Sequence, residues 1–197
     1  MLPYMKTLEI NKFKDYLSKA TNYFEFGSGG STIYACNMEI PNITSIENDL
    51  KWYNKLMNES IIKQNIQKNN LQIKLYDLKC TWWKHVSWAE FPESIENINK
   101  TYWLVYSNSI LECDEIQDLV LIDGRLRVAC ALKSYYKMDQ DSFLLFHDYI
   151  SRPQYNIIEK FFTIIESQDE LYVFKKKMEI SEIELKECIN KYKYFID

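Results

Sequence analysis

Hydrophobic positions along the chain follow two alternating spacings. Short apolar runs, typical of buried strands, recur between longer stretches whose apolar residues lie three or four positions apart, as in amphipathic helices. Strands are predicted at 23–26, 43–47, 71–76, 118–123 and 142–146. Helices are predicted at 8–17, 31–36, 50–66, 102–111, 125–136, 153–162 and 181–194. Two further apolar segments, 162–165 and 171–174, flank a polar turn and predict an antiparallel hairpin.

This alternation predicts an α/β fold: a Rossmann-like, doubly wound and mostly parallel sheet with helices on both faces and the hairpin at its C-terminal end. The run between Asp118 and Asp123 is apolar throughout, as expected for a parallel strand that is buried on both faces. We expect one domain over residues 1–197, with an N-terminal helix in 1–20, a core in 21–177 and a C-terminal helix in 178–197.

Composition narrows the function classes. The net charge of −4 disfavours a nucleic-acid partner, and no run reaches the ~18 apolar residues of a membrane span. The first residues lead into a polar, amphipathic stretch, which differs from a secretory signal. Five scattered cysteines without a Cys-x-x-Cys pair favour a reducing compartment. A cytoplasmic protein with no nucleic-acid or membrane partner is expected, and self-association into a homo-oligomer is left open.

The most informative stretch is 23–32, with the sequence Y-F-E-F-G-S-G-G-S-T. A predicted strand ends in a carboxylate, breaks into a Gly-rich turn and continues into a helix for which Ser31 is a candidate N-cap. Three of the four glycines, Gly27, Gly29 and Gly30, lie here, and Gly124 is the fourth. Such a turn brings backbone N–H groups and a helix N-terminus to a ligand. A plain strand-to-helix turn is the alternative.

Each predicted parallel strand ends at an acidic residue. These residues are Glu25, Glu47, Asp77, Asp123 and, after His147, Asp148. The carboxyl ends of parallel strands share one edge of the sheet, where ligands of such folds bind. An acidic edge suits a cationic ligand better than a phosphorylated one. Thr32 replaces the third glycine of a dinucleotide fingerprint, and no Gly-Lys-Ser/Thr follows the turn, which excludes a P-loop.

The ordered strings E-F-G-S-G-G-S-T, S-I-E-N-D-x-x-W and L-I-D-G-R resemble the class I S-adenosylmethionine-dependent methyltransferases, and the resemblance covers about residues 23–174. It implies that S-adenosylmethionine is the cofactor, with Glu25 near its ammonium, Glu47 on the ribose hydroxyls and Asp77 near the adenine. It also implies that Asp123 lies near the departing methyl group. The loop that would cradle the methionine part comprises Gly27, Ser28, Gly29, Gly30, Ser31 and Thr32.

The strings V-L-I-D-G-R-L-R-V and H-D-Y-I-S-R-P-Q-Y are similar to small bacterial and viral methyltransferases. His147-Asp148 with Arg152 also resembles plant glucuronoxylan O-methyltransferases. We therefore expect O-methylation of a sugar, a nucleotide sugar or another small polar hydroxyl compound. The candidate catalytic residues are Asp123, His147 and Asp148, with His147 suited to act as general base. A turn role for Asp123 and a plain strand-end role for His147 are the alternatives.

Acceptor contacts are expected from Arg125, Arg127 and Arg152, and from His85 and Trp88 in an irregular, aromatic-rich segment. The arginines could instead pair with acidic neighbours, and His85 and Trp88 could pack in a core.

The acidic strand ends also resemble metal-dependent catechol and macrolide-sugar O-methyltransferases, which carry Asp-Asp or Asp-Asn where this chain has Asp148-Tyr149. Asp123 and Asp148 are thus candidate magnesium ligands. The metal-free alternative has Asp148 orienting His147. Two other functions stay open: N-methylation of an amino sugar or a protein, and a catalytically silent protein that binds the cofactor or a partner.

Overall fold

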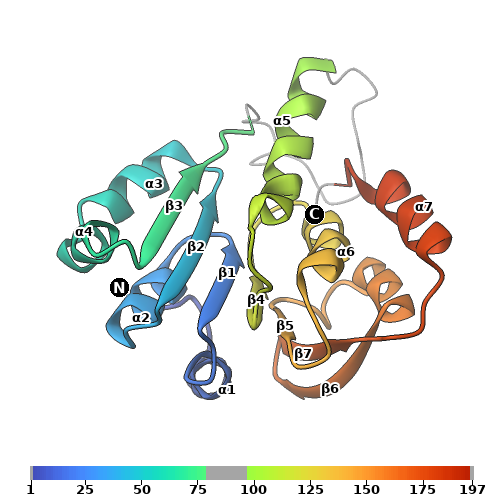
Figure 1. Cartoon of the computed structure of the whole chain (residues 1–197), viewed down its shortest axis with the longest axis horizontal. Coiled ribbons are helices and arrows are strands. Elements are labelled where there is room, and N and C mark those ends of the chain that lie inside the picture. The colour runs from blue at the N-terminus through green and yellow to red at the C-terminus, as the bar shows by residue number, and fades with distance from the viewer. Residues whose placement is uncertain (1, 79–96, 196–197) are drawn as a thin grey trace.

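A seven-stranded mixed sheet forms the centre of the molecule and confirms the predicted fold class (Figure 1). In this computed structural model, which describes residues 2–78 and 97–195, the strand order is β3-β2-β1-β4-β5-β7-β6. The strands are β1 (Asn22–Phe26), β2 (Asn42–Glu47), β3 (Leu71–Leu75), β4 (Leu119–Ile122), β5 (Phe143–Phe146), β6 (Phe162–Gln168) and β7 (Leu171–Lys176). Strands β1 to β5 are mutually parallel, and β7 is antiparallel to both β5 and β6, so β6–β7 is the expected hairpin.

Helices cover both faces of the sheet because successive side chains of each strand point to opposite sides. One face packs against α1 (Thr7–Leu17), α2 (Gly30–Asn37), α3 (Leu50–Met57) and α4 (Ser60–Gln67). The other face packs against α5 (Asn97–Asn108), α6 (Arg127–Ser134) and α7 (Glu182–Tyr192) (Figure 1). Short 3₁₀ segments complete this second face: η2 (Ser109–Glu112), η3 (Tyr135–Lys137) and η4 (Pro153–Lys160). Among the helices in the described ranges, none is long and apolar enough to cross a bilayer.

Several predicted helices differ from those observed. The helix expected at 50–66 is divided into α3 and α4, because Glu59 has extended backbone angles (φ −69°, ψ 131°). Leu56 and Ile62 are both fully buried in the same core. On one continuous helix these two side chains would lie about 120° apart around the axis, more than the roughly 100° width of a typical apolar stripe, and the break helps both reach that core.

Two other helices on the opposite face also differ from the prediction. The helix expected at 125–136 begins only at Arg127, since Leu126 has a left-handed backbone (φ 54°). The helix expected at 153–162 is the 3₁₀ helix η4.

The strand order reverses between β1 and β4, and the ladder there continues one residue beyond the strands. The backbone N–H of Gly27 donates to Ile46, that of Asp123 to Phe26, and that of His147 to Ile122. Gly27, Asp123 and His147 are therefore neighbours along one edge of the sheet. This edge lies at the carboxyl ends of the strands, where α/β sheets of this kind bind ligands at the point of reversal.

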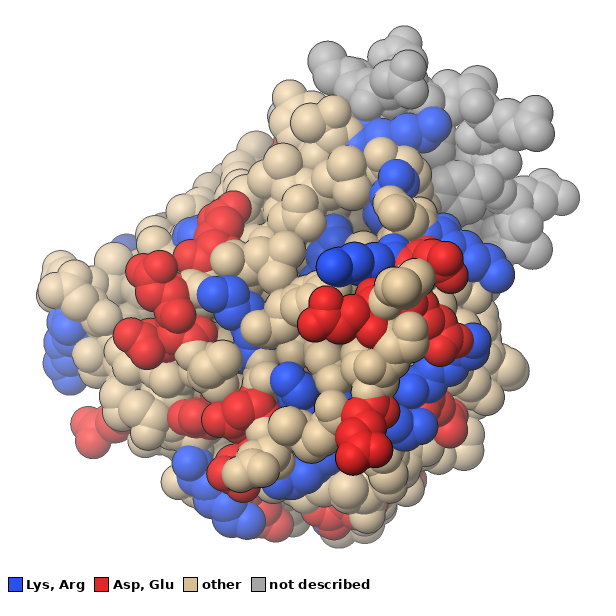
Figure 2. Space-filling model, turned by 45° about the vertical axis from the view of Figure 1, so that its right-hand side comes forward, with Lys and Arg blue, Asp and Glu red and all other residues tan. Residues whose placement is uncertain are grey.

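Charge is mixed over the surface. On the face shown in Figure 2, lysine and arginine side chains alternate with aspartate and glutamate, and no broad basic patch gathers among the described residues there.

Candidate active site

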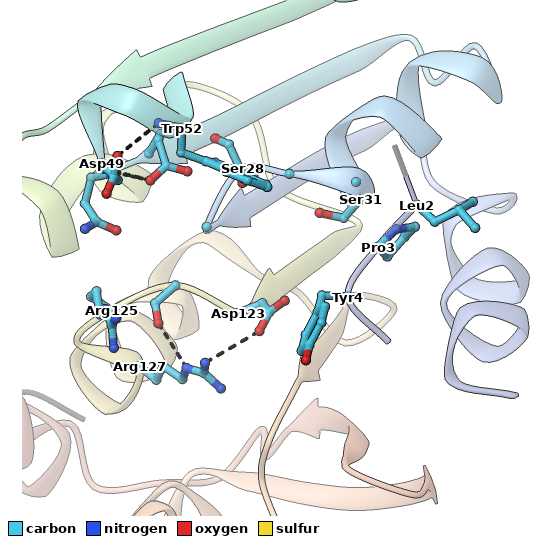
Figure 3. A pocket seen from close by; sticks show the side chains of 16 residues that line it. Leu2, Pro3, Tyr4, Ser28, Ser31, Asp49, Trp52, Asp123, Arg125 and Arg127 are labelled. Atoms are coloured by element: carbon cyan, nitrogen blue, oxygen red, sulfur yellow. Dashed lines mark hydrogen bonds and ion pairs between the residues drawn. The ribbon is translucent and has the colours of Figure 1, made fainter. Parts of the chain in front are cut away.

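A cavity of about 620 Å³ opens at the carboxyl edge, where the strand order reverses (Figure 3). It is lined by residues 2–4, 27–31, 47–49 and 123–125 together with Trp52 and Arg127. Its volume lies in the range of about 300–1,000 Å³ that is usual for small-molecule sites. The Gly-rich loop, the end of β2 and the end of β4 thus meet at one cavity, as their order in the sequence predicted.

Two glycines of the loop are required by contacts within the chain. Gly27 has φ 99°, and a Cβ there would lie 2.8 Å from the backbone of Asp123 and Gly124. A Cβ on Gly30 would overlap the backbone of Leu2 and Pro3, because the N-terminal segment packs directly against the loop. Figure 3 shows Leu2 and Pro3 beside Ser31, and Tyr4 beside Asp123. The N-terminal segment therefore forms one wall of the cavity, a role that the sequence did not indicate.

Glu25 lies beneath the loop and does not line the cavity. Its side chain is fully buried, and its carboxylate accepts hydrogen bonds from Tyr23 (2.9 Å), Ser31 (2.6 Å), Ser45 (2.7 Å) and Thr32. Burial raises the pKa of Glu25, although the hydroxyl donors oppose that rise. Glu25 is inside β1 and faces α2, and its hydrogen bonds with Ser31 and Thr32 stabilise the loop. The expected contact with the cofactor's ammonium stays a prediction.

The start of α2 also differs from the prediction, because Ser31 bonds to Glu25. The hydroxyl of Ser31 donates to Glu25, so Ser31 is not the N-cap, and Gly29 takes that position. Thr32 is fully buried, and its Oγ1 accepts from the backbone N–H of Gly29 at 2.8 Å. Of the predicted loop residues, 27–31 line the cavity and Thr32 does not.

Glu47, the last residue of β2, presents an unused oxygen to the cavity. Its Oε1 accepts from the backbone N–H groups of Asn48 (2.7 Å) and Asp49 (2.8 Å). Its Oε2 makes no hydrogen bond with any described residue. Burial is the largest influence on this carboxyl and raises the pKa of Glu47 to about 7. A carboxylate that is held through one oxygen and open at the other can accept hydrogen bonds from the hydroxyl groups of a ligand.

Trp52 adds an aromatic wall beside Glu47. It lies on α3, whose N-cap Asp49 accepts from the backbone N–H groups of Lys51 and Trp52. The indole Nε1 donates to the carbonyl of Ser28 at 2.6 Å, which fixes the ring against the loop. The string S-I-E-N-D-x-x-W contained this residue, but sequence reasoning gave it no role. Asp77 follows β3 and does not line the cavity.

Asp123, His147 and Asp148 meet at the ends of β4 and β5. Nδ1 of His147 lies 3.1 Å from Oδ1 of Asp123 and 3.5 Å from Oδ1 of Asp148. Burial opposes protonation of the ring, but the surrounding carboxylates outweigh it and raise the pKa of His147. The sequence predicted this cluster. It did not predict Glu9 of α1, whose Oε2 lies 3.6 Å from Nε2 of the same ring.

Arg127 joins the two aspartates. Nη1 lies 3.0 Å from Oδ2 of Asp148 and donates to the carbonyl of His147 at 2.6 Å, while Nη2 lies 3.6 Å from Oδ1 of Asp123. Burial disfavours ionisation of Asp148, yet Arg127, His147 and Arg152 lower the pKa of its carboxyl. Arg127 is buried, so its main contacts are with the chain, as the alternative interpretation of the arginines had it.

The two other arginines predicted to contact the acceptor lie in different surroundings. Arg152 lies 3.3 Å from Oδ2 of Asp148 and donates to Tyr155, whereas Arg125 lines the cavity. His85 and Trp88 lie outside the described residues.

A second cavity, of about 680 Å³, lies on the other side of Asp123. It is lined by residues 3–6 together with Glu9, Asp123, Arg127, His147, Asp148 and Glu170. Pro3, Tyr4, Asp123 and Arg127 line both cavities. A molecule in each cavity would thus have Asp123 between them.

Solved structures share this architecture. A methyltransferase-like protein from Silicibacter pomeroyi superposes with a TM-score of 0.71, at 24% identity, over 96% of each chain. The chain has the class I methyltransferase fold. Two further solved structures share this fold. A candidate caffeoyl-CoA O-methyltransferase from Staphylococcus aureus superposes with a TM-score of 0.53, at 16% identity, over 89% of this chain and 86% of that one. A candidate methyltransferase from Escherichia coli superposes with a TM-score of 0.51, at 10% identity, over 90% of this chain and 92% of that one. No protein-family model matches the sequence, and no curated protein does.

Within this methyltransferase fold, a magnesium ion between Asp123 and Asp148 does not suit the residues present. One ligand atom from each of Asp123, His147 and Asp148 lies within 4.8 Å of the others, close enough for one cation. The guanidinium of Arg127 already lies against both carboxylates, and Nδ1 of His147 faces both as well. Magnesium is bound by oxygen ligands and water, and here it would be placed against the guanidinium of Arg127 and a ring nitrogen of His147. The negative charge that would attract it is compensated by the chain.

Proposed function

We propose that the protein is an S-adenosylmethionine-dependent methyltransferase that methylates a hydroxyl of a small polar acceptor, with a sugar or nucleotide sugar favoured. The observation that carries this proposal is the position of Asp123 between two cavities. One of them has the loop and open carboxylate expected for the cofactor, and the other has room for an acceptor. A cytoplasmic location remains a prediction of the composition, and self-association stays open.

The first cavity suits the parts of the cofactor. Oε2 of Glu47 can accept from the ribose hydroxyls, and the ring of Trp52 offers a flat face for the adenine. Residues 28–31 supply backbone groups and the N-terminus of α2 for the methionine carboxylate. The carboxylate of Asp123 would lie near the cationic centre and stabilise it.

The chemistry that S-adenosylmethionine supplies is a methyl group on a sulfonium: the acceptor oxygen bonds to the methyl carbon while the carbon–sulfur bond breaks and its electron pair stays on sulfur. The chain must align the two molecules and remove the hydroxyl proton. We assign proton removal to Asp123, whose side chain is 24% exposed and lines both cavities. His147 is less suited to this role because both of its ring nitrogens face carboxylates.

The lining of the second cavity favours one further candidate, methylation of an amine. Four carboxylates, those of Glu9, Asp123, Asp148 and Glu170, line it, and Lys6, Arg127 and His147 are the basic residues there. Oε2 of Glu170 is buried and has no hydrogen-bond partner among the described residues. An unpartnered carboxylate oxygen in this cavity favours an acceptor that carries an amino group.

Calorimetry with S-adenosylhomocysteine tests the cofactor. We expect binding to the wild-type protein, its loss in Glu47→Ala, and no binding of NAD. Binding of NAD alone would refute the proposal.

Mass spectrometry with a trideuterated methyl donor then tests the acceptor, using matched pairs such as glucose and glucosamine. Transfer to the hydroxyl of both members supports O-methylation. Transfer to the amino nitrogen alone selects the second candidate. S-adenosylhomocysteine binding without transfer to any compound would favour the catalytically silent alternative.

A further inference from the structure

A third carboxylate, from a helix remote in sequence, faces the far side of the His147 ring. We propose that Glu9 is a positioning residue of the methyl transfer: it holds Nε2 of His147, so that Nδ1 stays on Asp123, and Asp123 takes the proton from the acceptor. This inference rests on the proposed function and extends it to α1, to which neither the sequence motifs nor the fold assigns a part in the chemistry.

The position of Glu9 is fixed from several sides. The side chain is 2% exposed. Its Oε2 accepts from the backbone N–H of Lys6 at 2.7 Å, and its Oε1 accepts from that of Glu170 at 2.8 Å. The carboxylate therefore cannot turn away from the ring of His147, which lies 3.6 Å away at ion-pair distance. A buried carboxylate requires such compensation by donors and a cationic partner.

Several charged groups surround the ring of His147. Glu9 faces it from α1, Asp123 from the end of β4, and Asp148 is its chain neighbour. Arg127 of α6 contacts the carbonyl of His147 and both aspartates, whereas Lys6 and Glu170 line the same cavity without a direct contact to the ring. With three carboxylates at ion-pair distance, the pKa of His147 rises although burial opposes it.

Nε2 of His147 faces Glu9 and Nδ1 faces Asp123, so neither ring nitrogen is open to take a proton from the acceptor. The proton therefore goes to the carboxylate of Asp123, while the acceptor oxygen bonds to the methyl carbon and the electron pair of the breaking bond neutralises the sulfonium. The negative charge of Asp123 and the positive charge of the sulfonium disappear together, so the step balances. His147, held by Glu9, keeps the Asp123 carboxylate in place.

A purely structural role for Glu9, tying α1 to Lys6 and to the β6–β7 turn, is the competing explanation. The chain offers a matched control for it. Glu166 on β6 also ties α1 to the sheet, through Lys12 and Tyr16, and it makes no contact with His147 among the described residues. Glu166→Gln should loosen α1 without changing the ring.

Nuclear magnetic resonance of the full chain separates the two roles without any acceptor. The sequence has two histidines, so a His85→Asn variant assigns His147. We expect His147 to titrate above its usual value of ~6.5, and Glu9→Gln to lower the midpoint by about one pH unit or more. Glu166→Gln should leave it unchanged. A wild-type midpoint at or below ~6.5, or equal shifts in both variants, would overturn the inference. Where Glu9→Gln fails to fold, a wild-type midpoint at or below ~6.5 still overturns the inference.

Kinetics and calorimetry keep this inference distinct from the proposed function. Glu9→Gln should lower kcat by about 10- to 100-fold, as for other residues that orient a catalytic group, with the acceptor KM and the affinity for S-adenosylhomocysteine unchanged. If the wild-type protein does not bind S-adenosylhomocysteine, the proposed function fails, whatever His147 does. If it binds and Glu9→Gln leaves both kcat and the His147 midpoint unchanged, only the role of Glu9 fails.

Discussion

The carboxylates at the two halves of the carboxyl edge have different partners. On the β1–β2 side, Glu25 is fully satisfied beneath the loop, and Glu47 leaves one oxygen open to the cavity. On the β4–β5 side, Asp123 and Asp148 contact Arg127 and His147. A site that binds a fixed ligand needs open acceptors, whereas a site that moves a proton needs groups held in one orientation. We therefore expect the β1–β2 side to bind the cofactor and the β4–β5 side to carry out the reaction.

The largest expected effect comes from removing the group that both cavities share. Asp123→Asn should lower turnover by ~10²–10⁴-fold, the usual cost of losing a positioned acid or base, because the amide cannot take the acceptor's proton. Affinity for S-adenosylhomocysteine, measured by calorimetry, should change little, since Glu47 and the loop are intact. Turnover near the wild-type rate would show that another residue is the base. The proposed division into a binding side and a reacting side would then lose its support.

The next effect is on stability, and it tests the pairing on the β4–β5 side. Arg127→Met should lower the free energy of unfolding by about 3 kcal/mol, because it leaves Asp123 and Asp148 close together without their buried cation. The lower end of the usual range applies because both aspartates are partly exposed. Urea unfolding measures the change.

Lys74→Met is the matched control for that variant. It removes an ion pair with Glu112 that is more open to solvent, and it should cost at most about 1 kcal/mol. Equal losses in the two variants would mean that the buried pairing has no special weight.

The sequence predicted the strands well and the contacts of the site unevenly, for physical reasons. Apolar runs locate strands β1 to β5, and parallel topology then places Asp123 beside His147. Glu9 could not be found in this way, because the packing of α1 over the strand ends is a tertiary contact without a local signal. The break between α3 and α4 likewise reflects the packing of two side chains into one core.

Glu25 and Glu47 show a second limit of sequence reasoning. Both are acidic residues near a strand end, and their register places them on the same face of the sheet. Glu25 is inside β1 and is covered by α2, whereas Glu47 is the last residue of β2 and reaches the cavity. A shift of one or two residues along a strand decides between a structural and a ligand-facing carboxylate, and the sequence does not fix strand ends that closely.

A smaller effect is expected in the pH dependence of cofactor affinity. Ribose hydroxyls donate to Glu47, so binding favours the ionised carboxylate, whose pKa in the free protein is about 7. Below that pH the carboxyl must lose a proton on binding, which weakens affinity. Calorimetry should show S-adenosylhomocysteine binding about tenfold tighter at pH 8 than at pH 6. Glu47→Gln should bind weakly and without this dependence. A dependence that persists in Glu47→Gln would assign it to another group.

The smallest expected effect is that of magnesium on the wild-type protein, and it bears most directly on the β4–β5 side. Two neighbouring carboxylates require a cation or a proton. Here Arg127 is that cation, so 5–10 mM magnesium should leave the wild-type Tm unchanged, and EDTA should leave turnover unchanged; about this concentration suffices for a weak carboxylate site. In Arg127→Met the cation is missing, and magnesium should then raise the Tm. Loss of wild-type activity in EDTA, restored by magnesium, would show that the two aspartates bind a metal after all and that Arg127 does not replace it. A rise in Tm for the variant alone would show instead that the chain supplies from its own α6 the positive charge that a metal would otherwise provide.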